Sequence, residues 1–189
     1  MREEFNKYLD RVREASDRLW VPSIDYEDGL ILYSITYTYI ASRNNVVAVD
    51  GGSGVGYSTL WMAEALENGC VGKCILYAVE LDDKRFETMV NLFKDFKFYN
   101  VDIEYVHEDL RSFLRELNRS VDLIFVDIRK DQYLDVLKIL EDKLSKDGII
   151  LFHNAILPPP PRSLIDEVNR RWRYTVVPTR LGILIVSRR

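Results

Sequence analysis

A glycine-rich segment, Asp50-Gly51-Gly52-Ser53-Gly54-Val55-Gly56, directly follows a short apolar run. Glycines in such a turn let the backbone approach a ligand closely and adopt positive φ. The next helix is predicted to begin near Tyr57, where its free N–H groups would face polar ligand atoms. The pattern D-x-G-x-G-x-G therefore predicts a cofactor-binding loop. Its expected contact residues are Asp50, Gly52, Ser53, Gly54, Gly56, Tyr57 and Ser58.

Two classes of cofactor compete for this loop. The dinucleotide fingerprint G-x-G-x-x-G, started at Gly52, requires glycine at position 57, where the chain has Tyr57. Asp50 would repel a pyrophosphate, whereas it would attract a cation such as the amino group of an amino-acid-like cofactor. A tight turn that binds nothing is the third interpretation. The pattern favours the cationic cofactor over a nicotinamide dinucleotide.

Two further acids stand at the ends of later apolar runs. Glu80 ends the run at 74–80 and could accept both hydroxyls of a ribose. Asp109 follows the run at 101–107, where it could bond an adenine amino group or cap the next helix. One carboxylate can do both, so both roles stay open for Asp109.

The elements that must position these residues alternate regularly along the chain. Four helices are predicted between five apolar runs, which indicates a mostly parallel sheet with helices on both faces. Parallel strands are buried on both sides, which accounts for runs without polar alternation such as LIFV. The predicted strands lie at 45–50, 74–80, 101–107, 121–127 and 148–152. The predicted helices lie at 57 to about 67, 83–95, 109–117 and 131–144.

The two ends of the chain differ from this alternation. Apolar residues at helical spacing predict helices at 3–19 and 25–42. After a predicted helix at 163–171, strands at 174–178 and 181–187 are joined by a turn so short that they must be antiparallel. The predicted fold is α/β: a Rossmann-like, doubly wound sheet of seven strands, mostly parallel, with a C-terminal antiparallel hairpin.

Length and composition restrict the class of protein. The 189 residues predict one domain, 1–189, with N-terminal helices at 1–43 and a Rossmann-like core at 44–189. A hydrophobic fraction of 47% and a charged fraction of 30% exclude disorder. No apolar run approaches the roughly 20 residues that span a bilayer, and the charged N-terminus has no signal-peptide pattern. We therefore expect a cytoplasmic protein whose two cysteines, Cys70 and Cys74, are partly buried thiols.

The positive charge is concentrated at the C-terminal end. Residues 162–189 hold seven arginines and two acids, although the whole chain has a formal net charge of −4. Such a segment could contact nucleic acid, but a solvated helix face and tail is the simpler interpretation.

Together these residues resemble the class I S-adenosylmethionine-dependent methyltransferases. Within that group the chain is most similar to the metal-dependent O-methyltransferases of the catechol and caffeoyl-CoA type, from about Pro22 to Ser187. The segment 56–60 matches the family segment after the glycine loop. The run 121–127 with Lys130 matches the region of its fourth strand.

The resemblance implies a methyl transfer to an acceptor hydroxyl that a divalent cation activates. By position, Asp127 is a cofactor contact and metal carboxylate, Lys130 is the general base and Asn154 is a metal ligand. The chain departs from the family at His153, where the family has aspartate, and at Arg129, which adds positive charge. Imidazole suits zinc, iron, nickel or copper better than magnesium.

Three interpretations of this site follow from the departures. The chain could bind a softer metal through Asp127, His153 and Asn154, or use Lys130 or His153 as a base without a metal. The third possibility is a non-catalytic S-adenosylmethionine-binding protein. The expected acceptor is a small molecule, with RNA as the alternative. No membrane partner is expected, and the chain could form a homodimer.

Overall fold

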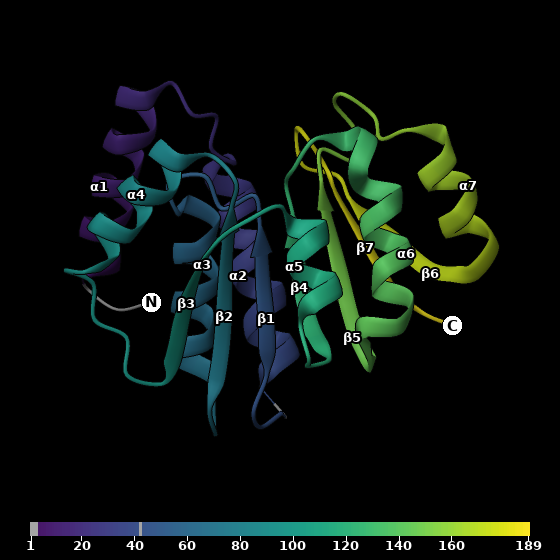
Figure 1. The fold of residues 1–189 in the computed structure, drawn as a ribbon, viewed down its shortest axis with the longest axis horizontal. Coiled ribbons are helices and arrows are strands. Elements are labelled where there is room, and N and C mark those ends of the chain that lie inside the picture. Colours follow the sequence, from purple (N-terminus) through teal and green to yellow (C-terminus); the bar gives the residue numbers. More distant parts are fainter. Residues whose placement is uncertain (1–3, 42) are drawn as a thin grey trace.

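Seven strands form one sheet in the order β3-β2-β1-β4-β5-β7-β6 within the computed structural model, which describes residues 4–41 and 43–189 (Figure 1). The first five strands run parallel, whereas β7 pairs antiparallel with both β5 and β6. The strands are β1 Val47–Gly51, β2 Cys74–Glu80, β3 Val101–His107, β4 Val121–Val126, β5 Leu144–His153, β6 Trp172–Val177 and β7 Ile183–Arg188.

Helices cover both faces of this sheet (Figure 1). The helices α1 to α4 share one apolar core with the sheet, and α5 to α7 share the other. A short 3-10 turn, Lys130–Gln132, precedes α6. The helices are α1 Phe5–Leu19, α2 Tyr26–Ile40, α3 Tyr57–Gly69, α4 Asp83–Phe93, α5 Leu110–Glu116, α6 Tyr133–Lys143 and α7 Arg162–Arg171.

The apolar strands at the centre of the sheet explain why the cofactor loop lies where it does. Every residue of β1 is buried, because β2 and β4 pair with it on either side and helices cover both faces. The carboxyl ends of β1, β2 and β4 therefore meet at one edge. Ligands in open α/β sheets bind at this edge, where the strand order reverses.

The predicted α/β fold and its antiparallel C-terminal hairpin are confirmed. The element boundaries differ in a few places. The strand predicted at 148–152 begins at Leu144, and the hairpin strands are 172–177 and 183–188, so their connection is longer than predicted. The predicted helices 3–19 and 25–42 correspond to α1 and α2, but residues 3 and 42 lie outside the described part of the chain. No described helix is both long and apolar enough to cross a membrane.

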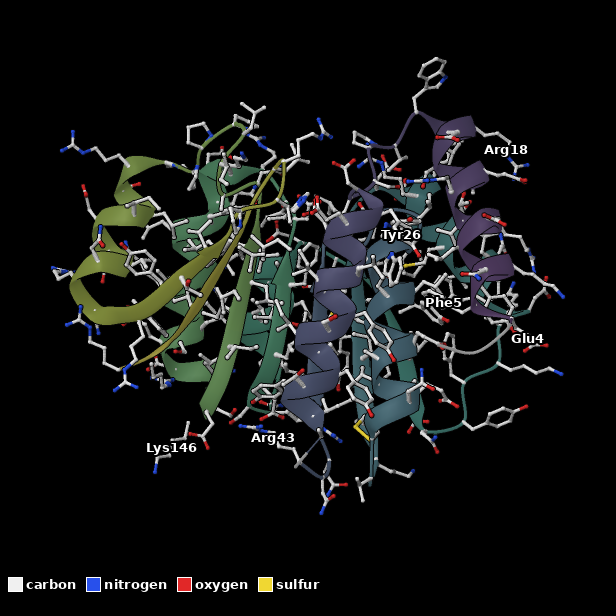
Figure 2. The ribbon with its side chains drawn as sticks, turned by 180° about the vertical axis from the view of Figure 1, so that it is seen from behind. Glu4, Phe5, Arg18, Tyr26, Arg43 and Lys146 are labelled. Carbon is white, nitrogen blue, oxygen red and sulfur yellow. A yellow bond between two sulfur atoms is a disulfide. The ribbon has the colours of Figure 1, made fainter. Side chains whose placement is uncertain are left out.

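The prediction of two free thiols is wrong in this structure, because Cys70 and Cys74 form a disulfide (Figure 2). The bond joins the residue after α3 to the first residue of β2, whose Cα atoms lie 6.2 Å apart. Sequence reasoning dismissed the pair because two cysteines do not form a disulfide framework. The turn between α3 and β2 brings them together, and the cytoplasmic location stays a prediction.

We predict that this disulfide stabilises the fold only modestly. It closes a loop of about five residues, so the loop-entropy model assigns it roughly 2 kcal/mol. Replacing both cysteines with serine should lower the unfolding free energy by no more than that amount, measured by urea denaturation. Wild-type protein in reductant is the matched control. A loss above about 4 kcal/mol would contradict the prediction.

Candidate functional site

A cleft of about 650 Å³ lies at the carboxyl ends of the parallel strands. Its walls come from the glycine loop after β1, from the ends of β2 and β3, from residues 127–129 after β4, and from Val21 and Pro22 after α1. Both Val21 and Pro22 also line a small adjoining cavity of about 20 Å³ that reaches the start of α3. The two cavities share Gly52, Gly54 and Asp127, so we treat them as one site.

The glycines of the loop are required by local geometry. Gly52 has φ of +88°, and a Cβ there would collide with the backbone carbonyl oxygen of Asp127. Gly56 has φ of +98°, and a Cβ there would meet the Phe93 ring of α4 at 2.5 Å. Side chains at these positions would force the loop away from the end of β4 and from α4, and would distort the cleft wall that the loop forms.

Asp50 lies beneath the loop and does not line the cleft. Its side chain is fully buried, and its Oδ2 accepts hydrogen bonds from Ser58 Oγ at 2.8 Å and Thr59 Oγ1 at 2.5 Å. Its Oδ1 has no hydrogen-bond partner among the described residues. Burial raises the pKa of Asp50 to about 6, although Thr59 and Ser58 oppose the shift. At neutral pH Asp50 is therefore largely a carboxylate, buried beneath the loop, and its Oδ1 accepts no hydrogen bond from the described residues.

Glu80 is at the rim, where the sequence predicted it. Its Oε2 accepts from the Gly54 amide at 2.7 Å, and its Oε1 accepts from the amides of Leu81 and Asp82 at 2.9 Å. The carboxylate lines the cleft and is fixed in orientation by these amides. Its remaining lone pairs can accept hydrogen bonds from vicinal hydroxyls.

Asp109 caps the N-terminus of α5, which is one of the two roles predicted for it. Its Oδ1 accepts from the Arg111 and Ser112 amides, and the Arg111 guanidinium contacts both carboxylate oxygens at 3.1 Å. Burial acts to raise the pKa of Asp109, but the Arg111 contacts outweigh it and keep the pKa below its ordinary value. The carboxylate also lines the cleft. An adenine amino group would therefore share Asp109 with Arg111.

The other predicted contacts lie around the small cavity. Ser53, Tyr57 and Ser58 line it at the start of α3. Ser53 Oγ donates to the Asp50 carbonyl at 2.9 Å, which holds the loop closed over β1.

Acids predominate among the charged residues that line the cleft. The lining includes two arginines, Arg85 and Arg129, and six acids. The carboxylates are Glu80, Asp82, Asp83, Glu108, Asp109 and Asp127. A negative lining attracts a cationic ligand and opposes a pyrophosphate.

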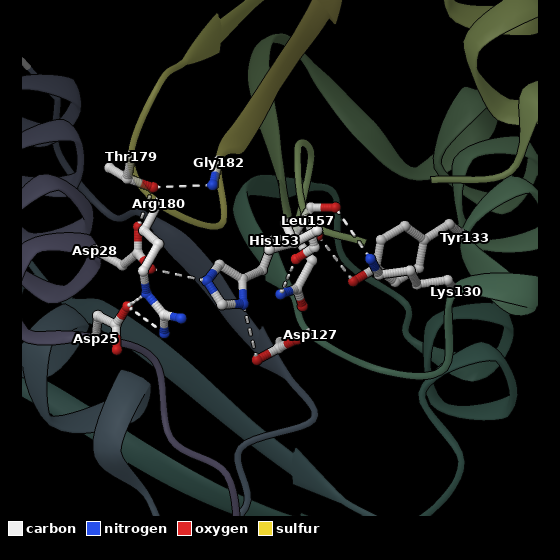
Figure 3. A network of polar contacts seen from close by, with 11 residues as sticks. Asp25, Asp28, Asp127, Lys130, Tyr133, His153, Leu157, Thr179, Arg180 and Gly182 are labelled. Carbon is white, nitrogen blue, oxygen red and sulfur yellow. Dashed lines mark hydrogen bonds and ion pairs between the residues drawn. The ribbon is translucent and has the colours of Figure 1, made fainter. Parts of the chain in front are cut away.

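His153 lies between two carboxylates at the end of β5 (Figure 3). Its Nε2 is 3.1 Å from Asp28 Oδ2, within hydrogen-bond distance. Its Nδ1 is 3.2 Å from Asp127 Oδ2. This second contact is an ion pair whose angles do not fit a hydrogen bond. The His153 side chain is only 3% exposed and that of Asp28 is 1% exposed, whereas the side chain of Asp127 is 28% exposed.

This arrangement favours the imidazolium form of His153. Burial alone would lower the pKa of His153, but the contacts and charges of Asp127 and Asp28 outweigh it and raise the pKa to about 9. The contacts with His153 and Thr179 likewise outweigh burial and lower the pKa of Asp28. At neutral pH both ring nitrogens therefore carry protons, which argues against His153 as a general base or a metal ligand.

Lys130, the predicted general base, lies beside the loop that follows β5 (Figure 3). Its Nζ donates to the backbone carbonyls of Asn154, at 3.2 Å, and of Pro158. Burial lowers the pKa of Lys130, and the charge of Asp127 opposes that shift. Lys130 is not among the residues that line the two cavities, so it reaches the acceptor only if it leaves the loop carbonyls.

The three predicted metal ligands do not form a cation site. The Oδ2 of Asp127 faces His153, and the amide nitrogen of Asn154 donates to the Leu157 carbonyl at 3.3 Å. Within residues 4–41 and 43–189, no group of three or more His, Cys, Asp or Glu side chains is arranged to hold a metal ion. A dication would also adjoin the imidazolium, so the residues present do not fit a metal.

Sequence reasoning missed two residues of this network. Asp28 lies on α2, and Thr179 lies in the loop between β6 and β7. Thr179 Oγ1 donates to Asp28 Oδ1 at 2.5 Å and accepts from the Gly182 amide at 2.9 Å. Asp28 stands beside Glu27 in the first turn of α2, where acids ordinarily favour the helix N-terminus, so its burial left no signal in the sequence.

The chain belongs to a methyltransferase family, because the model of a methyltransferase domain matches residues 49–155, more than half of its length. Solved structures share the fold. A methyltransferase from Geobacter sulfurreducens has a TM-score of 0.79 at 20% identity, covering 97% of this chain and 90% of that one.

Two further structures with the same fold are named as O-methyltransferases. TomG from Streptomyces achromogenes, involved in tomaymycin synthesis and crystallised with S-adenosylmethionine (SAM), has a TM-score of 0.78 at 17% identity, covering 96% of this chain and 89% of that one. An O-methyltransferase from Bacillus cereus in complex with SAH has a TM-score of 0.74 at 17% identity, covering 97% and 91%.

We predict that the His153 contacts make the fold less stable in alkali. Because the pKa of His153 is raised, its stabilisation is complete below its ordinary value of 6.5 and is lost as pH rises through about 9. Within that window each pH unit should cost about 1.4 kcal/mol of unfolding free energy. Urea denaturation at pH 6.5 to 9 measures the slope.

The two histidines provide matched variants. His153→Gln should abolish the slope, whereas His107→Gln should retain it, because His107 is exposed and its ion-pair partner, Asp83, is exposed as well. Equal unfolding free energies for the wild type at pH 6.5 and 9 would contradict the prediction.

Proposed function

We propose that this methyltransferase transfers a methyl group from S-adenosylmethionine to an oxygen of a small molecule. The observation that carries the proposal is the acidic cleft above a glycine loop, with the buried Asp50 carboxylate beneath it. S-adenosylmethionine is cationic at its sulfonium and carries an ammonium and a ribose. The O-methyltransferases with the same fold support oxygen as the acceptor atom.

The residues present fit this cofactor. Glu80 would hold the ribose hydroxyls, and Asp109 would accept from the adenine amino group. The unpartnered Oδ1 of Asp50 would balance the ammonium, directly or through water. The bound cofactor supplies a methyl group on an electrophilic sulfonium. The protein contributes orientation and a proton acceptor for the attacking hydroxyl.

Lys130 is the proposed proton acceptor. Burial lowers its pKa, which increases the fraction of neutral amine at a given pH. Asp127, which is part of both cavity walls, would orient the acceptor hydroxyl. The loop carbonyls of Asn154 and Pro158 hold Lys130 until an acceptor replaces them.

RNA is a weaker candidate for the acceptor, because most arginines of the C-terminal end have internal partners. Arg171 pairs with Glu141 and Glu167, and Arg180 pairs with Asp25 at 2.8 Å. Arg188 donates to the carbonyls of Glu141 and Leu144. The homodimer stays a prediction.

We predict micromolar binding of S-adenosylmethionine and no measurable binding of NAD by isothermal calorimetry. Glu80→Gln should raise the Kd at least tenfold, because it removes a charged hydrogen-bond acceptor.

Gly52→Ala should abolish binding, because its Cβ would collide with Asp127. Glu104→Gln makes the same change on the exposed side of β3 and should leave the Kd unaltered. Binding of NAD without S-adenosylmethionine would overturn the proposal.

Methyl transfer itself is tested with methyl-labelled cofactor and a panel of phenols and catechols, with RNA in parallel. Label in a small molecule supports the proposal, and label in RNA alone supports the weaker candidate. Cofactor binding with no labelled product from either would identify a non-catalytic binding protein.

Lys130→Met should lower kcat at least a hundredfold with the best acceptor of that panel, because a general base contributes at least that factor. Lys130→Arg can still donate to the loop carbonyls but cannot lose its proton, so it should be equally inactive. Wild-type kcat should rise with pH through the lowered pKa of Lys130. An active Lys130→Arg enzyme would instead assign Lys130 to holding the loop.

A further inference from the structure

The space between Asp28 and Asp127 is filled by a protein group. The His153 ring is 3.1 Å from one carboxylate and 3.2 Å from the other, and its side chain is 3% exposed. A cation bound to Asp127 Oδ2 would lie against the ring. His153 therefore occupies space that a metal ion at this oxygen would need.

The ring matches both neighbours only as a cation. Nε2 lies within hydrogen-bond distance of Asp28 Oδ2, and Nδ1 lies within ion-pair distance of Asp127 Oδ2. A carboxylate accepts hydrogen bonds and carries negative charge, so the imidazolium is the form of the ring that suits both neighbours. The buried Asp28 requires such a partner, because an uncompensated buried charge is strongly destabilising.

Neighbouring side chains hold the His153 backbone and Asp28 in place. Tyr133 Oη donates to the His153 carbonyl at 3.2 Å, and Thr179 holds the far oxygen of Asp28. Figure 3 shows Asp28 and Asp127 on the two sides of the His153 ring, with Thr179 bound to Asp28. The ring cannot turn toward the cleft without breaking its contacts with both carboxylates.

Building on the proposed methyl transfer, we infer that the imidazolium of His153 supplies the positive charge that a divalent cation would otherwise supply beside Asp127. Methyl transfer by this chain then uses no metal. His153 is a positioning residue, which acts on the acceptor only by fixing the carboxylate of Asp127.

The test measures metal binding and does not depend on activity. Wild-type protein is titrated with Mn²⁺, followed by electron paramagnetic resonance of the free ion, and with Zn²⁺ by calorimetry. We expect no saturable site for either ion. His153→Asp would place a third carboxylate between Asp28 and Asp127, and should bind Mn²⁺ at one site at least tenfold more tightly than wild type.

His153→Asn is the matched control, because it removes the imidazole without adding charge. It should bind Mn²⁺ at least tenfold more weakly than His153→Asp. Saturable binding by the wild type that Asp127→Asn abolishes would overturn the inference, as would a folded His153→Asp protein that binds no Mn²⁺. The wild-type titration still decides if His153→Asp does not fold.

Failure of this inference is separable from failure of the proposed function. A wild-type protein that binds Mn²⁺ through Asp127 and also binds S-adenosylmethionine would refute only the metal-free site. A protein that binds neither would refute only the proposed cofactor.

Discussion

Two buried or half-buried carboxylates face one buried imidazole from opposite sides, and the geometry of the site depends on that contact. Asp28 comes from α2, Asp127 from the end of β4 and His153 from the end of β5. Removing one partner of a buried ion pair typically costs 3–5 kcal/mol, because the other charge is left uncompensated. The contact therefore ties a helix outside the Rossmann-like core to the strand ends that carry the chemistry.

The other carboxylates of the site differ in how the protein balances their charge. Glu80 and Asp109 have their charge spread over backbone amides or an arginine, so they are rigid acceptors for neutral hydroxyl and amino groups. Asp50 has an unpartnered oxygen and a raised pKa, so it gains most from a cationic ligand. Asp127 is held by His153 and faces both cavities. Because the carboxylates differ in this way, the site suits both a cationic cofactor and a neutral acceptor.

The parts of the site that follow local rules were predictable from the sequence. The glycine loop, Glu80 and Asp109 each follow a parallel strand, and parallel strands end at the same edge of a sheet. Asp28 is separated from His153 by 125 residues and from Thr179 by 151, so no spacing rule connects them. His153 was recognised as unusual, but its charge depends on Asp127 and Asp28 together, and its contact with Asp28 on α2 is seen only in the fold. The disulfide was missed for a different reason: the turn between Cys70 and Cys74 was expected, but the spacing alone did not show that it brings the two sulfur atoms into bonding distance.

The charge of His153 is the central claim, and ¹⁵N NMR of histidine-labelled protein at pH 7 tests it most directly. The chain has only two histidines, so a His107→Gln variant assigns the spectrum. We predict that both ring nitrogens of His153 are protonated, and that neither EDTA nor added Mg²⁺ or Zn²⁺ changes their shifts. A neutral ring with one unprotonated nitrogen, or shifts that move with Zn²⁺, would contradict the claim.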